Sequence, residues 1–183
     1  MNRNIAINMG STLNIKKHKN RGLMNKELNK KYFWVIILTM FLLPIISIIT
    51  ESMILKIQGL NWNVVYKWFV FWAVGIRLLI AGIKQVLNPE FTAKEILKIE
   101  GSESYVILRE LGFANICFGI SGILSILGKE WYMISSISGG LYLGLAGVQH
   151  IFKRGKANNE KLAMISDLFA FITIIICFVN TRA

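Results

Sequence analysis

Seven strongly polar side chains lie inside the apolar stretches of this chain or at their edges: Arg77, Gln85, Glu110, Asn115, Gln149, His150 and Asp167. A guanidinium can bind one or two carboxylates through charge-assisted hydrogen bonds, so we expect Arg77 to pair with Asp167, Glu110 or both. A histidine beside a carboxylate can carry protons near neutral pH, which gives His150 the chemistry of a relay. We call these seven residues the candidate polar cluster.

Two interpretations of this cluster stay open. In the first, it lines a water-accessible vestibule that binds or transports a small polar or ionic ligand, or relays protons, because ionisable groups within a membrane are by default candidates for function. In the second, Arg77, Glu110 and Asp167 form a structural ion-pair staple in an accessory membrane subunit, and headgroups or water satisfy His150. The sequence predicts neither a catalytic residue nor a cofactor, since no nucleophile-and-base or phosphate-loop motif occurs.

A metal site formed by Glu110, His150 and Asp167 is a weaker third option. One histidine with two scattered carboxylates lacks the ligand spacing that identifies a metal centre. The two cysteines do not help, because Cys117 and Cys177 each lie in an apolar stretch as small hydrophobic residues. No metal is therefore predicted.

The composition indicates that the helices that carry these residues lie in a lipid membrane. Hydrophobic residues are 54% of the chain and charged residues 17%, which is more apolar surface than a soluble domain of 183 residues can bury. The sequence predicts one all-α transmembrane bundle of about five spans, at residues 32–50, 64–83, 111–128, 131–152 and 162–179. The connection 84–109 is expected to hold a short interfacial helix that begins at a capping box formed by Thr92 and Glu95.

The net charge of +11 is concentrated at one end. Eight of the 21 lysine and arginine residues lie in residues 1–31, which we expect to be a disordered basic cytoplasmic tail that contacts anionic lipid headgroups. Met24 is an alternative start, with residues 1–23 as a leader. No module that reads nucleic acid accompanies the charge, so nucleic acid is not an expected partner.

The positive residues also predict an orientation. With the N-terminus in the cytoplasm, sixteen lysine and arginine residues fall on the cytoplasmic side and four on the other side, with Arg77 inside the membrane. The sequence therefore predicts a multi-pass protein of the cell (inner) membrane, with its N-terminus inside and its C-terminus outside. All seven residues of the candidate polar cluster then lie in the cytoplasmic half of the bundle.

Glycines at helical spacing predict where helices pack closely. One stripe lies in the third span and another in the fourth: Gly112, Gly119 and Gly122, then Gly140, Gly144 and Gly147. Absent side chains let two backbones approach, which is a main source of helix association in lipid. Packing within the chain is the expected use, and a homo-oligomer or a partner in a membrane complex stays open.

Short runs of residues carry a resemblance to known proteins: Arg77-x4-Gly82-x2-Gln85-x3-Pro89, Glu110-x-Gly112-Phe-Ala-Asn115 with Gly119, Gly144-x2-Gly147-x2-His150, Asn158-Asn159 and Asp167. On these runs, residues 77–176 resemble an uncharacterised family of small bacterial multi-span membrane proteins and, more distantly, the DoxX-like four-helix group. The resemblance implies a shared shape and polar set, but no activity. By analogy alone, the association of some DoxX-like proteins with membrane redox complexes implies a quinone-linked accessory role.

Overall fold

The structure is a computed structural model that describes residues 28–97, 99, 101–153 and 156–182, and every regular element in these residues is a helix. This confirms the all-helical class that the sequence predicts. Most of the predicted tail 1–31, including both candidate start residues, lies outside the described residues. Within them the chain forms five long helical stretches, at Lys30–Ile54, Trp62–Leu87, Ser104–Leu127, 129–152 and Asn158–Asn180.

Several of these stretches contain wide turns between their α-helical parts. The first consists of α2 (Lys30–Ile37), η1 (Leu38–Leu42) and α3 (Leu43–Ile54), and the second of α4 (Trp62–Phe69), η2 (Val70–Ile76) and α5 (Arg77–Leu87). In the first, Pro44 explains the wide turn, because its ring cannot be accommodated by regular α-helical hydrogen bonding. The Asn29 side chain caps this helix by accepting a hydrogen bond from the backbone nitrogen of Tyr32 at 3.1 Å.

The remaining elements follow the same pattern. The third stretch is α7 (Ser104–Ile123) with η4 (Leu124–Leu127), the fourth is α8 (Lys129–Ser135), η5 (Ser136–Gly140) and α9 (Leu141–Phe152), and the fifth is α10 (Asn158–Asn180). The third helix begins at Ser104 rather than at 111, so the connection from the second helix is shorter than predicted. It contains α6 (Pro89–Phe91) and η3 (Thr92–Leu97). Asn88 caps α6, whereas Thr92, the predicted cap, is a buried helical residue.

Four helices are long and apolar enough to cross a membrane: Lys30–Ile54, Trp62–Leu87, Ser104–Leu127 and Asn158–Asn180. The fourth stretch, 129–152, is of similar length, but its four glycines and three serines make it less apolar, and it is not among the four. The helices are thus those of a membrane protein, with four spans identified by length and composition instead of the predicted five.

Two tightly packed helix pairs form the body of the molecule. The glycine stripe of α7 lies against α5 and η2: a Cβ on Gly112 would lie 2.9 Å from the carbonyl oxygen of Gly82, and one on Gly119 would lie 2.6 Å from the backbone nitrogen of Leu79. Gly122 meets the backbone of Gly75 in the same way. This close approach leaves no room for side chains, so this glycine stripe forms a contact between helices of the same chain.

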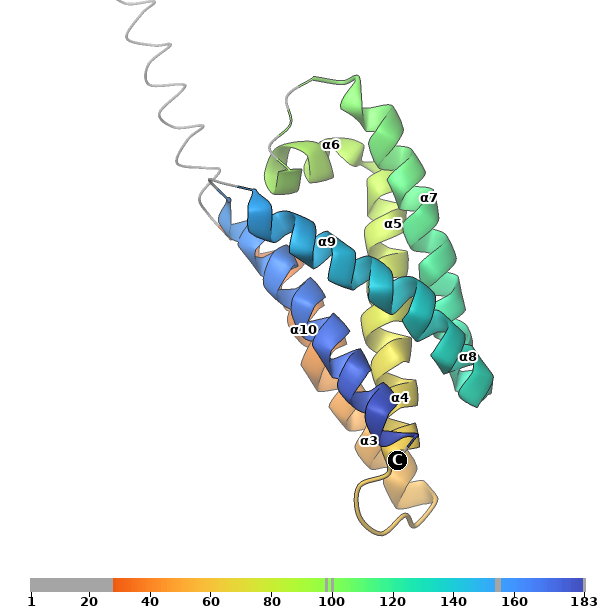
Figure 1. The fold of residues 1–183 in the computed structure, drawn as a ribbon. Helices are drawn as coiled ribbons and strands as arrows, with labels where there is room; N and C mark the ends of the chain where they lie inside the picture. Colours follow the sequence, from red (N-terminus) through yellow and green to blue (C-terminus); the bar gives the residue numbers. More distant parts are fainter. Residues whose placement is uncertain (1–27, 98, 100, 154–155, 183) are drawn as a thin grey trace, which may run out of the picture.

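The second glycine stripe forms the contact in the other helix pair, α9 and α10. Gly140, Gly144 and Gly147 pack against side chains of α10, where a Cβ on Gly144 would lie 2.7 Å from the ring of Phe171. In Figure 1, α9 and α10 lie side by side, and α9 runs away from α7 as it leaves α8, while α6 lies across the end between the pairs. The two pairs therefore diverge towards this end.

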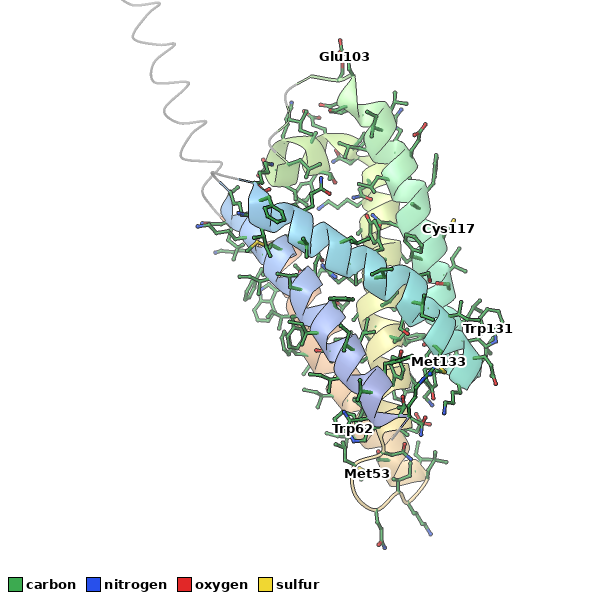
Figure 2. All side chains as sticks on the ribbon, viewed as in Figure 1. Met53, Trp62, Glu103, Cys117, Trp131 and Met133 are labelled. Carbon is green, nitrogen blue, oxygen red and sulfur yellow. The ribbon has the colours of Figure 1, made fainter. Side chains whose placement is uncertain are left out.

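Contacts at both ends show how the fourth stretch runs. At one end, the Tyr132 hydroxyl of α8 donates to Asn63 Oδ1 of α4 at 2.8 Å. At the other end, the backbone nitrogen of Asn29 donates to Asn159 Oδ1 of α10 at 2.8 Å. Figure 2 shows Trp62 and Trp131 towards the first end and Glu103 at the second. Residues 129–152 therefore run the length of the bundle, from the start of α4 to the start of α10.

Candidate functional site

A cavity of about 1000 Å³ lies where the two helix pairs diverge, with η3 over its end. We call it the wedge cavity. Residues of α2, α5, η3, α7, α9 and α10 line it. Six of the seven residues of the candidate polar cluster are among them: Arg77, Gln85, Asn115, Gln149, His150 and Asp167. The structure thus brings most of the cluster to one hollow.

Arg77 and Asp167 form a buried ion pair between α5 and α10. Arg77 Nη2 donates to Asp167 Oδ1 and, at 2.9 Å, to Ser166 Oγ, whose own hydroxyl donates to the carbonyl oxygen of Ala163 at 2.8 Å. The Tyr32 hydroxyl also lies near the guanidinium. Arg77 Nη1, however, is buried and has no hydrogen-bond partner. The arginine is thus held on one side and left with an unused donor on the other.

Asn115 and Gln85 form a second polar pair, between α7 and α5. Asn115 Nδ2 donates to Gln85 Oε1 at 2.7 Å. Asn115 is buried, and its Oδ1 has no hydrogen-bond partner, although the side chain of Tyr142 lies near. A buried carbonyl oxygen without a donor is costly, so this atom is a ready acceptor.

His150 belongs to a third group, centred on a carboxylate that the sequence reasoning missed. Glu160 of α10 is fully buried, and its Oε1 lies 3.2 Å from His150 Nδ1 and 3.1 Å from Lys153 Nζ. Lys153 Nζ also donates to the carbonyl oxygen of Leu97 at 2.6 Å, which ties the end of η3 to the α9–α10 pair. Glu160 Oε2 has no partner.

Glu110 does not join the cluster, which corrects the prediction that it could pair with Arg77. It is exposed and does not line the wedge cavity. Glu110 lies five positions before Asn115, so the two side chains point about 140° apart around the helix. Glu110 therefore lies on a different face of the helix from the cluster. Among the described residues, no group of three or more histidine, cysteine or acidic side chains could hold a metal ion, so Glu110, His150 and Asp167 do not converge.

Gln149 lines the cavity from a more exposed position, next to His150. Glu160 was missed because it precedes the predicted fifth span at 162, whereas α10 begins at Asn158 and carries it inwards. The signal was available in the adjacent Asn158-Asn159, which often precede or begin a helix. Cys117, labelled in Figure 2, points outward from α7 and takes no part.

Two lysines complete the lining at the end of the cavity, Lys31 of α2 and Lys84 of α5. Lys84 Nζ lies 3.2 Å from the centroid of the Phe91 ring, and the two ammonium groups are close enough to interact electrostatically. The cavity therefore offers cationic groups, one buried unused donor and one buried unused acceptor. Such a set can bind a ligand that carries negative charge and hydrogen-bonding groups.

Comparison with known proteins gives a family without an activity. The model of a family described as a family of unknown function (DUF6790) matches residues 30–183. No curated protein and no solved structure matches the chain. The match agrees with an uncharacterised family, and the comparisons show neither a link to the DoxX-like group nor a bacterial origin.

Proposed function

This chain belongs to DUF6790, a family of unknown function, and we propose that it is a membrane protein that binds a small polar or ionic ligand in the wedge cavity. One observation carries the proposal. Arg77 Nη1 and Asn115 Oδ1 are buried without partners, and both residues line the same hollow. A ligand or its bound water that accepts from the first atom and donates to the second would remove the cost of burying both.

The structural alternative, in which the cluster is only a staple, is less well supported. A staple would be dry and fully paired, whereas Arg77 uses one terminal nitrogen and leaves the other unused. An accessory subunit would also be expected to leave a glycine stripe exposed for its partner. Both stripes are instead covered within the chain, by α5 with η2 and by α10.

The proposal includes five spans with the N-terminus in the cytoplasm. The third helix ends beside α4, and α10 begins beside α2, at the opposite end of the bundle. If the neighbouring helices span the bilayer, residues 129–152 must cross it as well. Twenty-four helical residues give about 36 Å, enough for a hydrocarbon core of about 30 Å. Sixteen positive residues against four then favour a cytoplasmic position for the wedge cavity.

Thiol labelling tests whether water reaches the cavity. Cysteine is placed at Asn115 or His150 in a chain whose Cys117 and Cys177 have been changed to alanine. A membrane-impermeant maleimide is then applied to sealed vesicles of each orientation. We expect both positions to react from the cytoplasmic side, because a ligand site has to be reachable from water.

Phe113→Cys is the matched control, because Phe113 lies two residues from Asn115 on the lipid-facing side of α7 and is 54% exposed in the absence of lipid. It should stay unlabelled at the same depth. Absence of labelling at both Asn115→Cys and His150→Cys in folded protein would overturn the ligand-binding proposal. Equal labelling of Phe113→Cys would overturn it too, since the reaction would then report loose packing.

A further inference from the structure

The charges around the wedge cavity are unbalanced. Arg77 is paired with Asp167, and Lys153 with Glu160. Within the described part of the chain, Lys31 and Lys84 form no salt bridge, although both line the cavity and lie near each other. Two ammonium groups within electrostatic range of each other repel, and an anion bound between them would offset this repulsion.

Beyond the lysines, the walls are mostly apolar. Side chains from five elements supply this surface: Val35, Leu78, Ile96, Leu111, Leu143 and Ala146. Such a wall gains nothing from a small hydrated ion, but it favours the apolar part of a larger ligand, because binding removes apolar surface from water. At about 1000 Å³, the cavity has room for a ligand with both parts.

The cavity also reaches the apolar outer surface of the bundle. Ile80 of α5 and Leu145 of α9 both line it, yet they are 41% and 62% exposed. Ile80 lies four residues before Lys84, which places it about 6 Å deeper in the membrane. With the helices placed across the bilayer as proposed, the surroundings of these exposed side chains are lipid rather than water. A ligand can therefore enter sideways from the bilayer, between α5 and α9.

We propose that the wedge cavity holds an anionic amphiphile from the cytoplasmic leaflet, with its anionic group between Lys31 and Lys84 and its apolar chain along the walls towards Ile80 and Leu145. This inference rests on the proposed function and specifies the ligand class. Asn115 and Arg77, deeper in the cavity, supply an acceptor and a donor for the polar groups that join the anionic head to its chain. The same anionic chemistry could come from a membrane lipid or from a soluble phosphate ester.

Native mass spectrometry of the full chain, purified in a neutral detergent, distinguishes these sources. The protein is incubated with phosphatidylglycerol, with phosphatidylcholine of the same acyl chains, or with glycerol 3-phosphate. We expect one retained phosphatidylglycerol, about tenfold less phosphatidylcholine, and no glycerol 3-phosphate. Equal retention of both lipids would overturn the proposal, as would binding of glycerol 3-phosphate alone, which would identify a soluble anion.

Charge variants locate the bound lipid. Lys31→Gln and Lys84→Gln should each lower phosphatidylglycerol retention about fivefold. Lys161→Gln is the matched control, because Lys161 is an exposed lysine at the same end of the bundle that does not line the cavity. It should retain lipid like the unaltered chain. An equal loss for all three variants would mean general attraction to lipid at the surface and would overturn the assignment to the cavity.

Filling the cavity tests the apolar part without touching a charge. Ala81→Phe and Ala146→Phe place a ring into it from opposite walls, α5 and α9. Either one, eluting as a single folded species, should lose most of the retained phosphatidylglycerol, and full retention in a folded filled variant would overturn the proposal. If the maleimide labels Asn115→Cys but the protein retains no lipid, the amphiphile proposal is overturned, and the proposal of a polar-ligand site remains. If neither Asn115→Cys nor His150→Cys is labelled and no lipid is retained, both proposals are overturned.

Discussion

The Arg77 side chain joins two helices and also keeps one nitrogen able to donate a hydrogen bond to a ligand. One of its terminal nitrogens binds Asp167 and Ser166, which fixes the guanidinium between α5 and α10. The other has no partner. Burying a guanidinium is tolerable only when a countercharge lies beside it, and the Asp167 carboxylate serves this purpose. The pair therefore keeps a hydrogen-bond donor buried between the helices, where an isolated arginine would be too costly.

The first prediction concerns this pair. Arg77→Ala leaves the buried Asp167 carboxylate without its partner, so we expect a loss of about 3–5 kcal/mol in stability. The double variant Arg77→Ala with Asp167→Asn removes the unpaired charge and should recover part of the loss. The measurement is the midpoint of thermal unfolding of detergent-purified protein, followed by size-exclusion chromatography after heating.

Glu90→Gln is the control, since Glu90 pairs with Lys94 on an exposed helix surface, where such pairs contribute about 0–1 kcal/mol. It should leave the midpoint nearly unchanged. If the double variant is no more stable than Arg77→Ala alone, the pairing does not carry the stability assigned to it.

Between helices, the two glycine stripes determine which elements can touch. The α7 stripe brings its backbone onto that of α5 and η2, whereas the stripe of η5 and α9 lies nearest to side chains of α10. A backbone contact cannot adjust to an added methyl group, but the end of a side chain can turn aside. The two seams should therefore differ in their tolerance of the same substitution.

The second prediction uses this difference. Gly119→Ala places a Cβ 2.6 Å from the backbone nitrogen of Leu79, and Gly140→Ala places one 3.0 Å from Cδ1 of Ile174. We expect the first to lower stability by about 1–3 kcal/mol and the second to cost clearly less. The free energy of unfolding in mixed micelles measures both. Equal losses would show that the α5–α7 contact is no tighter than the α9–α10 contact.

Sequence reasoning identified elements better than the faces of those elements. The apolar stretches located the long helices, because burial in lipid makes every position apolar except those with a partner. Pairing was harder to predict, because the helical turn between Glu110 and Asn115 points Glu110 outwards. Glu160 was missed for a different reason, since it lies just before the predicted start of the fifth span at 162, whereas the helix carries it to a fully buried position.

At the scale of the whole molecule, divergence of the helix pairs creates the cavity. The pairs meet where Tyr142 of α9 packs on Phe118 of α7, with ring centroids 5.0 Å apart, and separate beyond this contact. A bundle packed evenly along its length would leave no such hollow. Lys153 contacts both Leu97 of η3 and Glu160 of α10. The segment η3, which lies over the end of the cavity, is therefore attached to the α9–α10 pair.

The third prediction tests the path of the chain through the membrane. Fusions of a reporter active only in the cytoplasm, or only outside it, are placed after residue 101, after residue 128 and at the C-terminus. With five spans, we expect the first to report the cytoplasmic side and the other two the outer side. With four spans and residues 129–152 outside the bilayer, the C-terminus would report the side opposite to the one that five spans require.

The C-terminal fusion therefore decides whether 129–152 crosses. The structure argues for crossing, because Tyr132 contacts α4 at one end of this stretch and Asn159, just after it, contacts the start of α2 at the other. A cytoplasmic C-terminus, with the fusion at 128 still outside, would require the helix of 129–152 to leave the bundle. The wedge cavity would then lose its α9 wall, so this one result bears on the fold, the orientation and the ligand site together.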